Sequence, residues 1–388
     1  MSQKFALQRY MRENTAPFFS GSRLFFTIFR QVAEIIHTEF NAGGALSKFR
    51  LAINGYGRIG QCVLRACYER QDCADVEVVA LNELSDLETI TYLTRYDSTH
   101  GRFPVPVDSD ARGLLINNHS IQVLSQAEPE QLPWGELDVD LLLECSGSFK
   151  DRATAQRHIE SGAKKLLFSQ PAEADVDTTI VYGLNQDELN QQQTIVSSAS
   201  CTTNCVIPIL KLIDDAFGIA HGVTTTIHSA MNDQPVIDAY HQTDLRLTRA
   251  AMSSIVPVDT GLPKGIDRLL PHLSGKFESL HLRVPTMNVS AMDLTLCVQT
   301  DTSAEEVNRV LAEAAQKQLF GLLGYTEEPH ASVDFNHDPR SGIVDALTTS
   351  MPLLFKTLLK AKTLRISSST RRTRLPFNCS SRLYNLVM

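Results

Sequence analysis

One cysteine in the chain stands where its thiol could become a nucleophile. Cys201 lies in the run SCTTNC at 200–205, between a β-type run at 193–197 and an apolar, helix-like run at 206–213. A strand that feeds a helix through a polar turn places this thiol among unpaired backbone N–H groups, at the positive end of the helix dipole. That setting lowers the pKa of a thiol and populates the reactive thiolate. The alternative is a small buried apolar side chain, the common fate of a cysteine outside a disulfide.

A histidine follows at the end of another strand-like run. The β-branched run TTTI at 224–227 is followed directly by His228. Imidazole titrates near neutral pH and is a natural base partner for a thiol. We therefore predict Cys201 and His228 as the catalytic pair. Cys205 lies one helical turn after Cys201, which leaves a redox or metal role open, although no further ligand is spaced for a metal.

A glycine-rich turn predicts a dinucleotide site. The run GYGRIG at 55–60 follows a short strand at 50–54 and precedes a helical run at 61–67 and a second strand at 76–81. In this βαβ setting Gly55 makes the tight turn, Gly57 lets the backbone approach a pyrophosphate, and Gly60 permits close packing of helix on strand. The N-terminus of the helix holds the phosphate charge.

The second strand ends at an acidic residue, Glu83. A carboxylate at this place accepts the ribose hydroxyls of the cofactor and repels a 2′-phosphate, so we predict NAD rather than NADP. The alternative is a solvated loop carboxylate with no role in binding.

The remaining pattern predicts an α/β chain of two domains. Further buried-type strands at 139–145 and 164–171 alternate with helical stretches, which is typical of a doubly wound Rossmann domain, here residues 49–200. After Cys201 the strand-like runs at 222–227, 280–284 and 291–298 and a capped helix from Ser303 to Leu319 predict an α+β catalytic domain, residues 201–347, with a mainly antiparallel or mixed sheet. A long polar loop at 228–257 is expected to be functional or an interface.

Composition excludes several classes of protein. With Lys+Arg 36 against Asp+Glu 44, the net charge of -8 disfavours a general nucleic-acid binder. Eight cysteines among 388 residues, with no paired CxxC, favour neither a disulfide scaffold nor a zinc site. Reduced thiols indicate a cytoplasmic protein, and no apolar run approaches the ~18 residues needed to cross a bilayer.

Residues 1–48 form an N-terminal extension of different character. Apolar positions at helical spacing over 24–36 are compatible with a helix on a membrane surface or with an import presequence, although Glu13, Glu34 and Glu39 disfavour the latter. The third interpretation, and the one we favour, is a poorly ordered extension with no part in the chemistry.

Three motifs in order carry a resemblance to a known family. The runs NGYGRIG at 54–60, SCTTN at 200–204 and RVPT at 283–286 resemble those of the glyceraldehyde-3-phosphate dehydrogenase superfamily, over about residues 49–347. Within it, HSAMNDQ at 228–234 and DFNHDP at 334–339 are most similar to the bacterial D-erythrose-4-phosphate dehydrogenase branch. The resemblance implies a homotetramer that uses NAD, acts on a small phosphorylated aldose and takes part in vitamin B6 coenzyme synthesis.

The same resemblance implies roles for individual residues. Cys201 attacks the aldehyde and His228 acts as its base. Arg283 grips the substrate phosphate, for which a guanidinium is well suited. Other anionic oxygens are held by Ser200, Thr202, Arg246 and Thr260, and the cofactor contacts fall on Arg58, Ile59, Glu83, Ser146 and Ser169.

Two departures from the family pattern bear on function. Met231 replaces a phosphate-binding threonine of the glycolytic enzyme, which favours the longer tetrose over a phosphorylating triose dehydrogenase. After Leu347 the W-x-D-N-E-x-G-like motif that orients the nicotinamide is missing, since Trp134 is the only tryptophan. Residues 348–388 are rich in Ser and Arg, and we interpret them as resembling out-of-frame translation rather than a folded element, the alternative being a divergent tail that still docks. An inactive relative is therefore a further alternative.

Overall fold

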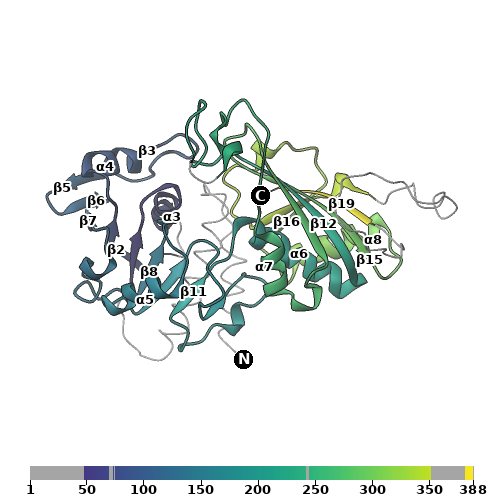
Figure 1. Ribbon diagram of the computed structural model, residues 1–388, viewed down its shortest axis with the longest axis horizontal. Helices are drawn as coiled ribbons and strands as arrows, with labels where there is room; N and C mark the ends of the chain where they lie inside the picture. Colours follow the sequence, from purple (N-terminus) through teal and green to yellow (C-terminus); the bar gives the residue numbers. More distant parts are fainter. Residues whose placement is uncertain (1–47, 70–72, 74, 242–243, 351–380, 388) are drawn as a thin grey trace.

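The chain builds two β-sheets that lie side by side. The computed structural model describes residues 48–69, 73, 75–241, 244–350 and 381–387. In Figure 1 the sheet of the N-terminal part (purple to teal) lies at the left and the sheet of the C-terminal part (green to yellow) at the right. The helix expected over 24–36 lies outside the described residues.

The first sheet has nine strands in the order β10-β11-β9-β8-β1-β2-β7-β6-β5. Its members from β10 to β7 pair in parallel, and only β6 and β5 are antiparallel. The strands are β1 (Phe49–Asn54), β2 (Val76–Asn82), β5 (Val107–Asp110), β6 (Gly113–Ile116), β7 (His119–Leu124), β8 (Leu141–Glu144), β9 (Lys165–Phe168), β10 (Thr178–Thr179) and β11 (Ile195–Ser197). A two-stranded ribbon, β3 (Tyr96–Asp97) and β4 (Gly101–Arg102), stands apart.

Helices cover both faces of this sheet. On β1, Leu51 and Ile53 belong to one apolar cluster, and Ala52 between them belongs to another. Val63 of α3 (Arg58–Glu69) packs in the first cluster, and Ala155 of α5 (Arg152–Glu160) in the second. A strand buried on both faces is expected in a parallel sheet, so the prediction of a doubly wound Rossmann domain is confirmed.

The strand order reverses between β1 and β8. The chain moves from β1 to β2 on one side, and from β8 to β9 and β11 on the other. In open α/β sheets a ligand crevice lies beyond the carboxyl ends of the strands at such a switch point. Here those ends are followed by Gly55 and Cys145.

The second sheet is mixed and has one face covered by helices. Its order is β13-β14-β12-β15-β19-β17-β16, with β12 parallel to β14 and antiparallel to β15. Apolar side chains from α6, α7, α8 and β15 form its core, among them Ile209, Ile266, Leu294 and Leu311. The elements are α6 (Cys201–Phe217), β12 (Ile219–His228), β13 (Val256–Val258), α7 (Leu262–Leu269), β14 (Phe277–Arg283), β15 (Ala291–Val298), α8 (Ala304–Gln316), β16 (Leu323–Thr326), β17 (Gly342–Asp345), β18 (Thr349–Ser350) and β19 (Ser381–Val387). The predicted α+β domain with a mixed sheet is confirmed.

Part of the C-terminal tail is a strand of this sheet. β19 lies between β15 and β17 and pairs antiparallel with both. We expected residues 348–388 not to form a folded element, and for Ser381–Val387 that expectation is wrong. The run LYNLV at 383–387 contains Tyr384 and Val387, residue types that are enriched in strands.

One further helix, α4 (Leu87–Arg95), follows β2 in the first domain. Within the parts of the chain that the structure describes, every helix is too short or too polar to cross a membrane.

Candidate active site

Cys201 is the first residue of helix α6. The N-cap is Ser200, whose hydroxyl oxygen accepts a hydrogen bond from the backbone N–H of Thr203 at 3.1 Å. The helix therefore begins at the cysteine itself, and Thr202 lies in its first turn rather than in a preceding loop. Ala199 has a φ of 58°, a left-handed conformation that is uncommon for a residue with a side chain. This sharp turn carries the chain from β11 into α6 and leaves the thiol at the helix N-terminus.

His228 is the last residue of β12, and its imidazole faces the thiol. Its Nε2 lies 3.8 Å from the Sγ of Cys201. On the other side of the ring, Nδ1–H donates to the carbonyl oxygen of Ser229 at 2.7 Å. That bond fixes the tautomer in which Nε2 is directed at the sulfur. The structure thus brings together two side chains that the sequence places on separate elements.

The two groups shift each other's titration in opposite directions. Burial alone raises the pKa of the Cys201 thiol, but the hydrogen bond and charge of His228 and the backbone N–H of Thr202 bring that pKa below its ordinary value. Burial lowers the pKa of His228, yet the contact with Cys201 and the carbonyl of Ser229 raise it above its ordinary value overall. Both shifts favour a thiolate beside an imidazolium, the form in which a cysteine is nucleophilic.

Arg283 reaches the same place from the neighbouring strand. In the parallel pairing of β12 with β14, Arg283 stands opposite His228. Its guanidinium is buried and makes a bidentate ion pair with Asp233, in which Nη2 donates to Oδ2 at 3.0 Å. The side chain expected to grip a phosphate is therefore next to the cysteine–histidine pair and is neutralised by an internal carboxylate.

The other residues expected at anionic oxygens are distributed differently. The hydroxyls of Ser200 and Thr202 lie 2.9 Å apart beside Cys201. Thr260 accepts a hydrogen bond from the N–H of Leu262 at 3.2 Å, just before α7. Arg246 is an exposed residue of the 3₁₀ turn Leu245–Thr248. Among the described residues, no hydrogen bond joins Arg246 or Thr260 to the cysteine–histidine pair.

The glycine turn has the shape that a pyrophosphate requires. A Cβ on Gly55, whose φ is 87°, would lie 2.4 Å from the Cα of Ser146, and a Cβ on Gly60 would lie 2.3 Å from the carbonyl oxygen of Gly55. Gly57 instead faces open space, with no atom within 4 Å of such a Cβ. Gly55 and Gly60 are thus needed for close packing, and the backbone of Gly57 is open to a ligand. This turn therefore fits the pyrophosphate of a dinucleotide.

Glu83 lies against this turn. One of its carboxylate oxygens accepts from the N–H of Tyr56 at 2.8 Å, and the other from the N–H of Leu84 at 2.8 Å. The carboxylate is thereby held at the rim of the glycine turn, where an acid that binds ribose hydroxyls is expected.

A buried carboxylate beneath the turn was not identified from the sequence. Glu144 ends β8, is fully buried, and accepts hydrogen bonds from the side chain of Asn54 and the N–H of Ser146, the latter at 2.7 Å. Burial raises the pKa of this carboxyl group. Ser169, expected at the cofactor, is itself buried and donates its N–H to the carbonyl of Glu144 at 3.0 Å. Polar residues at the ends of three adjacent strands were the signal that could have revealed this network.

Arg58 and Ile59 open helix α3. Arg58 forms an ion pair with Asp97, in which Nη2 donates to Oδ1 at 3.1 Å. Burial raises the pKa of Asp97, but Arg58 and backbone N–H groups lower it overall to about 2. Ile59 packs beside the apolar cluster under the turn. Arg58, expected to contact the cofactor, is thus held by a carboxylate at the start of the polar loop 97–102.

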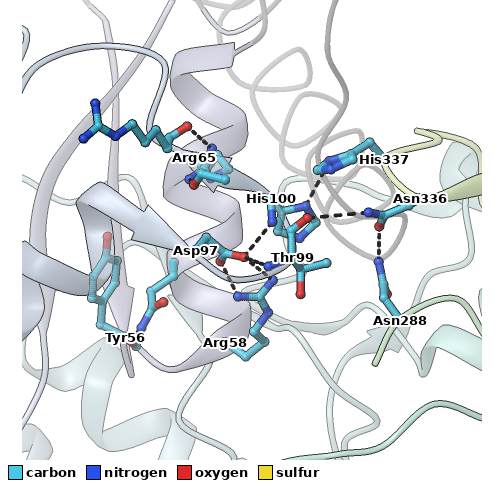
Figure 2. A network of polar contacts seen from close by, with 12 residues as sticks. Tyr56, Arg58, Arg65, Asp97, Thr99, His100, Asn288, Asn336 and His337 are labelled. Carbon is cyan, nitrogen blue, oxygen red and sulfur yellow. Dashed lines mark hydrogen bonds and ion pairs between the residues drawn. The ribbon is translucent and has the colours of Figure 1, made fainter. Parts of the chain in front are cut away.

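The same loop of the first domain makes polar contacts with the second domain. Figure 2 shows Asp97 and Arg58 beside His100, which faces His337 of the second domain. The two histidines approach at 2.9 Å between their Nδ1 atoms, and Asn336 donates to the carbonyl of Thr99 at 3.5 Å. These contacts connect the strand-end loop of the cofactor domain to the segment before β17.

Two protein-family models match the chain, one in each of the two domains. A family model described as glyceraldehyde 3-phosphate dehydrogenase, NAD binding domain, matches residues 49–152 and contains the glycine turn and Glu83. A second, described as glyceraldehyde 3-phosphate dehydrogenase, C-terminal domain, matches residues 200–362 and contains Cys201, His228 and Arg283. The second match extends past residue 347, where the motifs led us to expect the resemblance to end. With both models matched in order, the chain belongs to the glyceraldehyde-3-phosphate dehydrogenase family of NAD-dependent oxidoreductases.

Proposed function

We propose that this chain oxidises D-erythrose 4-phosphate to 4-phospho-D-erythronate with NAD, as a step in pyridoxal 5′-phosphate (vitamin B6) biosynthesis. The observation that carries the proposal is the contact between Cys201 and His228 at 3.8 Å, with pKa shifts of opposite sign. An aldehyde needs a nucleophile that can later leave, and a thiolate meets both needs.

Cys201 attacks the aldehyde carbon and forms a thiohemiacetal. The oxyanion that develops is stabilised by the backbone N–H of Cys201 at the start of α6 and by the protonated ring of His228. His228 gives its proton to this oxygen, which becomes the hydroxyl group of the thiohemiacetal, and the imidazole is left neutral. A helix N-terminus is suited to this task because its first N–H groups have no partner within the helix.

His228 then accepts the hydroxyl proton as the carbon is oxidised. NAD, when bound, supplies the nicotinamide ring that accepts the hydride. The carbon is left as a thioester on Cys201, and a water molecule oriented by His228 hydrolyses it to the acid. The hydrogen bond from Nδ1 to Ser229 keeps the same ring nitrogen facing the reaction throughout.

The cofactor is held by residues of the first domain. Gly55, Gly57 and Gly60 form the pyrophosphate turn, and Glu83 is placed for the ribose hydroxyls. The resemblance assigns further contacts to Arg58, Ile59, Ser146 and Ser169.

The substrate phosphate is held chiefly by Arg283. To bind there, the phosphate competes with the carboxylate of Asp233 for the guanidinium of Arg283. Ser200, Thr202, Arg246 and Thr260 are proposed to hold the remaining anionic oxygens, by resemblance.

The preference for the tetrose rests on Met231. This residue is 45% exposed and lies two residues before Asp233, at the position where the glycolytic enzyme has a threonine hydroxyl. Loss of a hydrogen bond to a charged group costs about 1.5–3 kcal/mol, so one phosphate subsite is weakened. The tetrose phosphate lies about 1.5 Å farther along the chain than that of the triose, so a rearranged subsite favours it.

We further propose a cytoplasmic homotetramer. Large apolar side chains are exposed on the loop after β12, namely Val236, Ile237, Tyr240 and Leu245, and on the open face of the second sheet at Val223 and Leu280. Such a surface is typical of a contact between subunits. A reducing compartment suits a mechanism that needs Cys201 as a thiolate.

The test is a comparison of two sugars in one assay. We expect faster NADH formation with erythrose 4-phosphate than with glyceraldehyde 3-phosphate, and no requirement for inorganic phosphate. Faster turnover of the triose with a requirement for phosphate would replace the proposal by a phosphorylating dehydrogenase. Labelling of Cys201 without NADH formation from either sugar would indicate an inactive relative that binds a partner. The absence of the motif that orients the nicotinamide supports this alternative.

A further inference from the structure

A second histidine lies directly against the ring of His228. His281 is on β14, two residues before Arg283 and opposite Thr226 of β12, so its side chain emerges on the same face of the sheet as the catalytic candidates. The two imidazoles stack with 5.0 Å between ring centroids and 24° between planes. Nothing in the proposed reaction uses this residue.

The surroundings of His281 keep it uncharged. Its Nε2 is buried and has no hydrogen-bond partner among the described residues. Burial, together with the charges of His228 on β12 and Arg283 on β14, lowers the pKa of His281 to about 4. β13 contributes the uncharged Val258 at the paired position. A neutral ring therefore faces the imidazole that becomes positive when Cys201 ionises.

The ring of His228 is thus fixed from three directions. Its Nδ1 is held by the carbonyl of Ser229 at 2.7 Å, its Nε2 faces Cys201, and one of its faces lies on His281. Rotation about the Cβ–Cγ bond would carry Nε2 away from the sulfur, and a flat neighbour opposes that rotation. Offset stacking of aromatic rings is favourable, and it is more so when one of the rings is a cation.

We propose that His281 is a positioning residue, whose stacked ring holds the imidazole plane of His228 so that Nε2 stays directed at the sulfur of Cys201. The inference rests on the proposed function only in assigning a catalytic use to that pair. The positioning itself is a property of the free protein.

The test is the pH profile of alkylation at Cys201, followed by mass spectrometry of its peptide in the full chain. Replacement His281→Leu keeps the volume and removes the flat ring, whereas His281→Phe keeps the ring and removes its nitrogens. We expect the leucine variant to react about threefold to tenfold more slowly near neutral pH, with the midpoint displaced upward, because aromatic pairs contribute about 0.5–1.5 kcal/mol. The phenylalanine variant should follow the unchanged protein.

A matched control lies on the same strand. Glu278 is exposed, and its side chain points to the opposite face of the sheet, so Glu278→Gln should leave the profile unmoved. His281→Met is a second ring-free variant if the leucine protein does not fold, because methionine adapts to irregular spaces.

Two results would overturn the inference. Coincident profiles for the leucine variant and the unchanged protein would show that the ring of His281 does not position His228. Equal displacement in the leucine and phenylalanine variants would show that a nitrogen of His281, rather than stacking, is what matters. A merely structural role would lower the thermal midpoint without moving the pH midpoint. No aldehyde or NAD enters the measurement, so a failure of the proposed function leaves its result unaffected.

Discussion

The guanidinium of Arg283 is held by the carboxylate of Asp233, with Nη2 at 3.0 Å from Oδ2. Arg283 is 8% exposed, and its Nε has no hydrogen-bond partner among the described residues. A substrate phosphate that binds this arginine must therefore replace, or share, an existing partner. In the proposed site, this ion pair makes binding selective for phosphate, since a weakly charged group competes poorly with a carboxylate.

The first prediction concerns this competition. The substitution Asp233→Asn removes the negative charge and keeps a hydrogen-bonding side chain. We expect the KM for the phosphorylated aldehyde to fall about twofold to tenfold with little change in kcat, because phosphate then meets an uncompensated guanidinium. Steady-state kinetics with a phosphorylated and an unphosphorylated aldehyde would measure it.

A control for that substitution lies on the same loop. Asp238 forms an exposed ion pair with Arg249 at 2.9 Å, and Asp238→Asn changes the loop charge equally. That variant should leave the KM unchanged. An unchanged or higher KM in Asp233→Asn would contradict competition for Arg283.

The second prediction separates two glycines of the cofactor turn. The methyl group of Gly57→Ala meets no atom within 4 Å, so we expect an unchanged thermal midpoint. We expect weaker NAD binding, because the methyl group occupies the space through which the pyrophosphate approaches the backbone. Gly60→Ala places a methyl group 2.3 Å from the carbonyl oxygen of Gly55, and we expect a loss of about 1–3 kcal/mol in the free energy of unfolding. Calorimetric titration with NAD and thermal denaturation measure the two effects. Equal losses of stability in both variants would argue against an open space at Gly57.

The third prediction concerns stability below neutral pH. His158 accepts a hydrogen bond from the indole N–H of Trp134 at 3.2 Å and stacks on Phe149. Burial lowers the pKa of His158 to about 4 from an ordinary value of 6.5. Between these two values the unfolded chain binds a proton that the folded chain does not. The stability contributed by neutral His158 is therefore present above pH 6.5 and is lost as the pH falls toward 4.

Replacement by a residue that does not titrate should reduce this loss. In His158→Phe we expect a smaller decrease of the urea midpoint on acidification, at the cost of about 1 kcal/mol near neutral pH for the lost hydrogen bond. The fluorescence of Trp134 reports the transition. His100, also with a pKa lowered to about 4 chiefly by burial, retains its own contribution in the variant. Identical pH dependence in both proteins would assign the effect to other groups.

Local patterns were enough to predict much of the fold. The glycine turn is specified by residues within one βαβ unit, and helix α8 by the cap at Ser303, whose hydroxyl oxygen accepts from the N–H of Glu306 at 3.2 Å. The strand before Cys201 and the strand that ends at His228 follow from their β-branched composition. Each of these depends on neighbours close in sequence.

What could not be predicted depends on distant pairings. Arg283 and Asp233 are 50 residues apart, and His100 and His337 are 237 apart, so no local pattern indicates their contact. The stacking of His281 on His228 requires the register of β12 with β14, which a single sequence does not specify. The strand β19 was not predicted, because residues 348–388 as a whole are rich in Ser and Arg, a composition that indicates an unfolded segment.

The central claim is that the contact with His228 lowers the pKa of the Cys201 thiol and so raises the share of thiolate at neutral pH. The most direct test is an ultraviolet titration of the thiolate, taken as the difference between the unchanged protein and Cys201→Ser. We predict a midpoint clearly below the ordinary thiol value of about 8.5, displaced upward toward it in His228→Asn. A midpoint at or above that value in the unchanged protein, or one that His228→Asn does not move, would contradict the account.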